Sequence, residues 1–215
     1  MFRLQAGSIV DETQPDQETA QSRPAADRRV RADAQRNLLT LLEVAKQVFA
    51  EAGTDAPIRT IAERAGLGIG TIYRHFPQRA DLIAAVFWQE IDACAGAADA
   101  LAAEHPPGDA LALWMQRFVE LASTKRGLAQ ALHSGDPAFD SLPVRREQRL
   151  RPAFRKLFSA ALDAGEIRSG VEADDFLDAA ATLCMSVDKS QREQARQFVA
   201  LLVDGLRCSA AEKHS

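Results

Sequence analysis

The sequence predicts an all-α protein of about nine helices. Three observations support this fold class. Apolar residues recur at steps of three and four along most of the chain, which places them on one face of each helix. No alternating pattern typical of a β-strand is longer than four residues. Glycine and proline residues separate the periodic segments, as expected where helices end. With 215 residues, 47% of them hydrophobic, the chain can bury one good core, or a small domain packed on a larger one.

A polar tail precedes three helices in the first part of the chain. Residues 1–30 hold few large apolar side chains, so we expect a disordered tail there. Gly53 and Gly66 end the first two helices, and Pro77 prevents the third from continuing. These helices are predicted over residues 38–52, 58–65 and 69–76. Arg28, Arg29 and Arg31 form a basic stretch that is either a solvated tail or an arm for a DNA minor groove.

Six further helices are predicted in the larger second part. Pro106, Pro107 and Gly108 end the first of them, a long helix that starts at Arg79. The predicted helices span residues 79–104, 109–122, 125–132, 144–164, 173–187 and 191–208. The chain is accordingly divided into a tail (1–30), a first domain (31–79), a second domain (80–208) and a C-terminal tail (209–215).

Charge and composition exclude several classes of protein. The net charge of −4 excludes a chain that is basic throughout, yet residues 23–79 carry ten basic and six acidic residues, a local net charge of +4. This cationic segment is where we expect an anionic partner. The three cysteines are far apart and show no metal-ligand spacing, which favours reduced thiols in the cytoplasm and neither a metal site nor a cofactor. No apolar run reaches about 18 residues, so we expect no membrane partner.

Residues 58–76 have the pattern of a helix-turn-helix motif. Ala62 and Ala65 are small where two helices must cross closely, and Gly66 suits a turn that needs a positive φ. Ile72 and Phe76 are one turn apart and are expected to point into the core. The remaining residues of the second helix form an outward face suited to a DNA major groove: Ile69, Gly70, Thr71, Tyr73, Arg74 and His75.

The surrounding residues resemble the DNA-binding domain of the TetR/AcrR family of transcriptional regulators over about fifty residues. The matching segments are Glu51-Ala-Gly53, Ile61-Ala-Glu-Arg-Ala-Gly66, Gly70-Thr-Ile-Tyr-Arg-His-Phe76 and Arg79-Ala-Asp-Leu82. The resemblance implies that Arg59, Tyr73, His75 and Arg79 contact phosphates. It also implies that Ile69, Gly70 and Thr71 lie nearest the base edges, and that Arg74 reaches either.

Two positions depart from the family pattern at helix starts. Gly68 and Gln78 stand where a capping Ser is common, although Asp81 still supplies an acid to the first turn of the helix after Gln78.

The second part of the chain resembles the C-terminal domain of SbtR-like members, through residues 117–128. In such proteins the larger domain binds a small effector and forms the dimer. Aromatic residues, Met and His supply the candidate pocket, although aromatic and Met side chains at helical spacing are also typical of a plain core. The candidates are Trp88, Trp114, Met115, Phe118, His133, Phe154 and Met185. The last two helices have broad apolar stripes, which predicts a homodimer through a four-helix interface.

A basic run from Arg145 to Lys156 leaves two interpretations open: a solvated helix face, or a site for an anionic effector.

The sequence thus predicts a ligand-responsive transcriptional repressor that binds a palindromic operator in double-stranded DNA as a homodimer. The alternative is a helical module that binds a small molecule or a protein without binding DNA. No catalytic triad, phosphate loop or metal spacing is present in the sequence, so we do not expect an enzyme.

Overall fold

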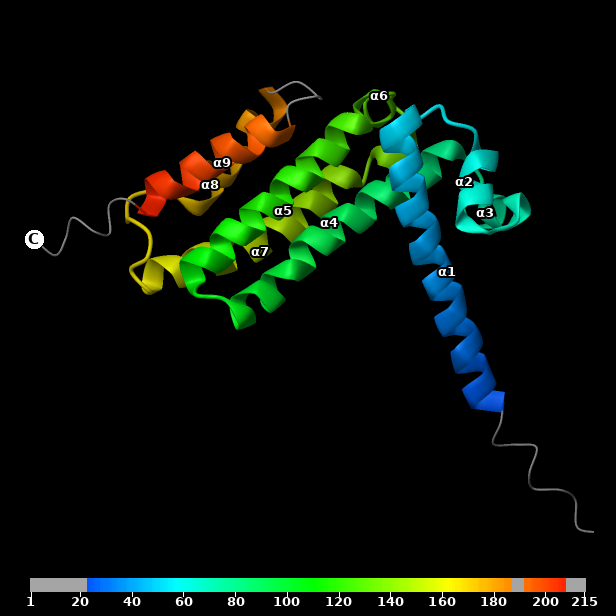
Figure 1. Cartoon of the computed structure of the whole chain (residues 1–215), viewed down its shortest axis with the longest axis horizontal. Coiled ribbons are helices and arrows are strands. Elements are labelled where there is room, and N and C mark those ends of the chain that lie inside the picture. Colours follow the sequence, from blue (N-terminus) through cyan, green and yellow to red (C-terminus); the bar gives the residue numbers. More distant parts are fainter. Residues whose placement is uncertain (1–22, 187–191, 208–215) are drawn as a thin grey trace, which may run out of the picture. The chain divides into compact units, whose positions relative to one another are not determined.

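The computed structural model describes residues 23–186 and 192–207, and these form nine α-helices and one short 3-10 helix (Figure 1). The helices are α1 (Arg23–Ala52), α2 (Ile58–Ala65), α3 (Ile69–His75), α4 (Arg79–Glu104), α5 (Pro107–Gly127), α6 (Ala129–Leu132), η1 (Pro137–Phe139), α7 (Leu142–Asp163), α8 (Ala173–Ser186) and α9 (Arg192–Arg207). The described ranges contain no strand, so the all-α prediction is confirmed.

The structure differs from the sequence prediction at residues 23–30, which were expected to be disordered and are helical in α1. Pro24 lies in the first turn, where its missing N–H costs no hydrogen bond. Extending a helix from an established segment fixes one residue for each hydrogen bond gained, so a polar segment rich in Arg and Ala can join the helix that follows it. Residues 1–22 and 209–215, the rest of the two expected tails, lie outside the described residues.

The chain divides into two units between Leu39 and Thr40. The described part of the first unit is the N-terminal portion of α1, where Arg36 pairs with Asp33 three residues earlier. The second unit starts with the remainder of α1 and contains every other helix.

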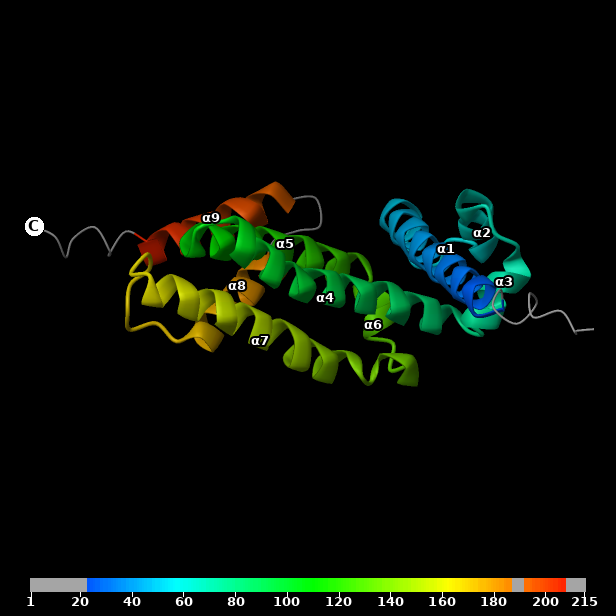
Figure 2. The ribbon, with the colours of Figure 1, turned by 90° about the horizontal axis from the view of Figure 1, so that it is seen from below.

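The core of the second unit is a layered helical body. Helices α4, α5 and α7 pack against one another, and α8 and α9 pack on α5 (Figures 1 and 2). An aromatic cluster fills the centre, with ring centroids 5.5–6.1 Å apart. Its members are Trp114, Phe118, Phe154, Phe158 and Phe176. The indole N–H of Trp114 donates a hydrogen bond of 2.8 Å to the carbonyl oxygen of Cys94, so this polar atom is satisfied inside the core.

The basic run of α7 forms ion pairs with acidic residues of the two neighbouring helices. Arg149 Nε lies 3.1 Å from Asp92 of α4, and Arg145 pairs with the same carboxylate. On the other side, Arg151 Nη2 lies 2.8 Å from Asp178 of α8. Arg155 likewise pairs with Asp174 of α8, and Lys156 with Asp99 of α4. Most of the run therefore serves as interhelical contacts.

The two leucines at the end of α7 allow a matched test of this packing. Leu157 is fully buried and Leu162 is exposed. We predict that Leu157→Ala lowers the free energy of unfolding by about 2–5 kcal/mol, because the lost methyl groups leave a cavity. Leu162→Ala should change it by no more than about 0.5 kcal/mol. Urea denaturation followed by circular dichroism measures both, and equal losses would contradict the observed position of α7.

Candidate functional site

The turn between α2 and α3 sets the direction of α3. Gly66 has φ 66°, in the left-handed region that a side chain with a Cβ adopts only with strain. Its N–H and that of Leu67 donate to carbonyl oxygens in the last turn of α2, the Leu67 bond to Ala62 being 2.9 Å long. Ile61 in α2 and Ile72 in α3 are each no more than 1% exposed, which fixes α3 by its inner face.

The outer face of α3 is exposed to solvent. Ile69 and Tyr73, four residues apart, are 44% and 50% exposed although both are large. Gly70, Arg74 and His75 are exposed as well, and Thr71 is half-buried. The structure therefore brings all six predicted residues of α3 onto or beside one accessible surface. That surface combines apolar, hydroxyl and cationic groups, as direct contact with DNA requires.

The helix starts differ in how they are capped. Gly68 precedes α3 and supplies no side-chain hydrogen bond to its first turn, in line with the departure seen in the sequence. At the start of α4 the N–H of Gln78 donates to Asp81 Oδ2 over 2.9 Å. Asp81 thus stabilises the start of α4, as its position in the first turn indicated.

The two remaining predicted DNA-contacting arginines have different surroundings. Arg59 of α2 is exposed and pairs with Glu63 one turn later, with Nε 3.0 Å from Oε1. Arg79, at the start of α4, is half-buried, and its Nη1 donates to the carbonyl oxygens of Thr54 (2.7 Å) and Ala56 (2.6 Å). These two acceptors lie in the segment that joins α1 to α2. Arg79 therefore holds the beginning of the helix-turn-helix against α4, a role that the sequence did not indicate.

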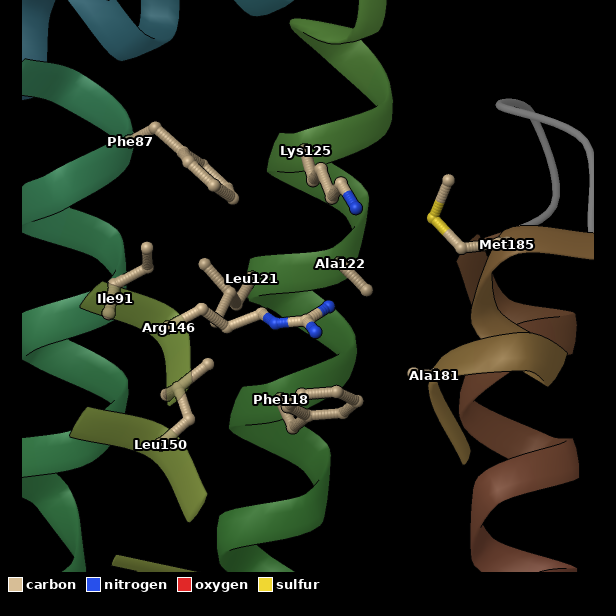
Figure 3. Close-up of a pocket in the computed structure, with 10 residues that line it drawn as sticks. All are labelled: Phe87, Ile91, Phe118, Leu121, Ala122, Lys125, Arg146, Leu150, Ala181 and Met185. Atoms are coloured by element: carbon tan, nitrogen blue, oxygen red, sulfur yellow. The ribbon is translucent and has the colours of Figure 1, made fainter. Parts of the chain in front are cut away.

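A second candidate site is a small cavity of about 50 Å³ between α4, α5, α7 and α8 (Figure 3). Its lining is mainly apolar, with two cationic side chains: Phe87, Ile91, Phe118, Leu121, Ala122, Lys125, Arg146, Leu150, Ala181 and Met185. We call this the inner cavity. An outer cavity of about 280 Å³ is lined by Phe87, Lys125, Leu132, His133, Phe139, Leu142, Pro143 and Arg146. The two cavities share Phe87, Lys125 and Arg146 and therefore adjoin.

Three of the seven pocket residues predicted from the sequence line these cavities. Phe118 and Met185 border the inner cavity, and His133 borders the outer one. His133 Nδ1 also lies 2.7 Å from the carbonyl oxygen of Ala129, so the ring caps the end of α6.

The other four predicted pocket residues line neither cavity. Trp114, Met115 and Phe154 are fully buried in the core. Trp88 is half-buried, with the guanidinium of Arg145 5.4 Å from its ring centroid. A periodic apolar pattern does not separate core residues from cavity residues, because both lie on the inner faces of helices.

Lys125 is a candidate site residue that sequence reasoning missed, whereas Arg146 was considered only as part of the basic run of α7. Burial lowers the pKa of Lys125, and the positive charge of Arg146 lowers it further. They are 21 positions apart in the chain, on α5 and α7, and only the packing of these helices brings them to one cavity.

Within the described ranges, no group of three or more His, Cys, Asp or Glu side chains is placed to hold a metal ion. Over the same ranges, no helix is both long and apolar enough to cross a membrane.

Comparison with known proteins agrees with this geometry. Residues 41–86 match the family model of bacterial regulatory proteins of the tetR family, and residues 106–208 match that of the SbtR-like transcriptional regulator C-terminal domain. A TetR transcriptional regulator from Streptomyces coelicolor, known from a crystal structure, has a sequence 37% identical to this chain. The two structures match with a TM-score of 0.70, and the match covers 79% of this chain and 98% of that one. The chain belongs to the TetR family. It is a DNA-binding transcriptional regulator by family, and this family is one of regulators and not of enzymes.

Further relatives support the same TetR-family assignment. A TetR regulatory protein from Mycobacterium vanbaalenii is 35% identical, with a TM-score of 0.67, and the match covers 83% of this chain and 99% of that one. An HTH-type transcriptional regulator of Staphylococcus aureus (strain USA300) is 36% identical over 64 residues. That match covers 29% of this chain and only 35% of the curated relative.

Substituting Arg79 and Arg59 in turn compares the hydrogen bonds that hold the helix-turn-helix motif with an exposed ion pair. We predict that Arg79→Ala lowers the free energy of unfolding by about 1.5–3 kcal/mol, because a charged donor to two backbone carbonyls is lost. Arg59→Ala is the matched control and should cost less than about 1 kcal/mol, because it removes only an exposed ion pair. Urea unfolding of both variants measures the difference, and equal values would argue against the structural role of Arg79.

Proposed function

We propose that this TetR-family protein is a ligand-responsive repressor that binds a palindromic operator as a homodimer. The observation that carries the proposal is the exposed outer face of α3, held in place by the buried side chain of Ile72. A short helix fixed by its inner face presents the other face rigidly to a major groove. The cationic balance of residues 23–79 favours an anionic partner for this part of the chain.

Each residue of this candidate surface has a proposed task on the DNA. Tyr73, His75 and Arg59 contact phosphates, and they fix the position of α3 along the duplex. Ile69, Gly70 and Thr71 lie nearest the base edges, with the methyl and hydroxyl groups of Thr71 reading the sequence. Arg74 is long enough to reach either.

Arg79 acts in two ways under this proposal. Its Nη1 holds the segment between α1 and α2, and its other N–H groups remain for a phosphate.

The exposed apolar residues near the C-terminus support the dimer. Leu201 of α9 is 68% exposed, and Phe198 on the same helix and Met185 on α8 are also exposed. The inner face of α9, which includes Ala195 and Val199, is fully buried against the body. A helix with apolar residues on its solvent side gains free energy by pairing with a second copy. Two subunits related by a twofold axis then present two α3 helices to successive major grooves, about 34 Å apart.

Helix α4 links the proposed ligand site to the DNA-binding surface. Its residues Phe87 and Ile91 line the inner cavity, and its first residue, Arg79, holds the segment before α2. An occupant that favours one position of α4 therefore favours one spacing of the two α3 helices. If that spacing misfits the operator, ligand binding weakens DNA binding, and DNA weakens ligand binding by the same factor. We expect the protein to act in the cytoplasm, with the DNA.

The experiment that tests the DNA-binding proposal is a selection of bound sites from random duplexes, followed by gel-shift titration. An enriched palindrome is expected. Recovery of no enriched sequence would instead favour a helical binding module without DNA recognition.

Substitutions on α3 test which face is used. We predict that Tyr73→Ala and Arg74→Ala each weaken operator binding by about 1–3 kcal/mol, because each removes a direct contact. Only Arg74→Ala should also reduce the slope of log affinity against log salt concentration, because it alone removes a charge. Arg168→Ala, at an exposed arginine between α7 and α8, is the control and should bind as the parent does. Parental affinity for both α3 variants would contradict the proposed surface.

The dimer is tested by placing a charge on α9. We predict that Leu201→Glu shifts the protein from dimer to monomer in sedimentation velocity, because an unpaired carboxylate is costly inside an apolar interface. Leu162→Glu, at an exposed position of α7, should remain dimeric. A dimeric Leu201→Glu variant with parental affinity would show that the interface lies elsewhere.

A further inference from the structure

We propose that the effector is an amphipathic organic anion, whose carboxylate binds between Lys125 and Arg146 while its apolar group occupies the inner cavity. This inference rests on the proposed ligand response and gives the chemical class of the ligand.

The position of the two cations is the first argument. Lys125 and Arg146 belong to the lining of both cavities, so they stand at the junction between them. Figure 3 shows both side chains extending from α5 and α7 toward the same space, with Met185 of α8 across from them. An anion placed at the junction can accept hydrogen bonds from both side chains at once.

The absence of an acidic neighbour is the second argument. Neither cavity is lined by an Asp or a Glu among the residues that the structure describes. In the described part of the chain, the ammonium group of Lys125 makes no ion pair. Among the described residues, Arg146 pairs with Glu147, at 2.8 Å, and Glu147 is shared with Arg151. The linings of the inner and outer cavities therefore carry, among the residues described, two cations and no carboxylate.

This arrangement contrasts with the other cations of α7. Arg149 and Lys156, for example, each face an Asp of α4. The acids of the neighbouring helices thus neutralise the outer part of the basic run and leave the cavity side uncompensated.

The third argument is that the surroundings of Lys125 disfavour its positive charge. Burial and the nearby Arg146 both disfavour the charged form of Lys125, as the lowered pKa of its ammonium group records. A bound carboxylate removes the repulsion between the two cations and replaces the water that Lys125 has lost. A neutral ligand can replace the lost water but does not remove the repulsion.

The remainder of the lining determines the rest of the ligand. The inner cavity is bordered by aliphatic and aromatic side chains, which favour an apolar group. At about 50 Å³ it accepts a short group as it stands. Met185 lies at its edge and is exposed, and its unbranched, flexible side chain can move to admit a longer one.

Isothermal titration of the full chain with matched pairs of probes tests the proposal. The probes are 3-phenylpropanoate with 3-phenylpropanamide, and hexanoate with hexanamide, which differ within each pair in charge and little in shape. We expect at least one carboxylate to bind about tenfold or more tightly than its amide, since hydrogen bonds to a charged group are stronger than neutral ones. Equal binding within both pairs, or no binding of any probe, would overturn the proposal.

Variants at the junction locate the anion. Lys125→Met keeps an unbranched side chain only one heavy atom shorter and removes its charge. It should weaken carboxylate binding about tenfold while leaving amide binding within about twofold. Lys156→Met, at a lysine outside the cavity, is the matched control and should bind as the parent does. The pair Arg146→Gln and Arg149→Gln repeats the comparison on α7. Parental carboxylate affinity in both Lys125→Met and Arg146→Gln would contradict the site.

Melting temperature and operator binding are measured as well, so that loss of the anion site is distinguished from unfolding and from loss of the ligand response. The melting temperature of Lys125→Met should equal or exceed that of the parent, because a partly buried charge that makes no ion pair with the described residues has been removed. Loss of binding in a folded variant then supports the site. Operator binding is measured by gel shift on the same samples without any probe. If the amide releases the operator as well as the carboxylate does, the ligand response stands and the anion inference is wrong.

Discussion

The two hydrogen bonds from Arg79 to the segment between α1 and α2 are the contacts on which the proposed mechanism depends. One guanidinium nitrogen binds two backbone carbonyl oxygens, so the first residue of α4 and the entry to the helix-turn-helix are fixed to each other. An ion pair also joins α1 to α4, with Lys46 Nζ 2.8 Å from Glu90 Oε1. Because Phe87 and Ile91 of α4 also line the inner cavity, one helix carries both part of the wall of the proposed effector site and the attachment of the DNA-reading surface.

Local chemistry explains why much of this architecture was predictable from the sequence. Helices α2 and α4 have the predicted bounds because Gly66, Pro77 and Pro106 act on their immediate neighbours, whatever the rest of the chain does. The outer face of α3 was predictable for the same reason, since the predicted inward position of Ile72 fixes which side of a short helix is turned outward. Phe76, which was also predicted to point inward, follows the end of α3 and is only half-buried. The helix bounds and the outer face of α3 both depend on residues that lie only a few positions apart in the chain.

Features that depend on tertiary packing were not predictable. The acceptors of Arg79 are backbone carbonyls, which every residue possesses, so no sequence pattern marks them. Lys125 and Arg146 meet only because α5 packs on α7, and periodicity gives no helix-to-helix register. Trp114 and Phe154 were candidates for the pocket, yet they form the core, because burial against protein and burial against a ligand favour the same side chains.

The place of Trp114 gives the protein an internal optical probe. Its indole is shielded from water and lies 5.9 Å, centroid to centroid, from the ring of Phe118, which lines the inner cavity. The emission of an indole responds to the polarity and mobility of its surroundings. A ligand that displaces Phe118 therefore changes the intrinsic fluorescence of the unlabelled chain. The other tryptophan of the chain, Trp88, lies beside Arg145 instead, so the two signals differ in environment.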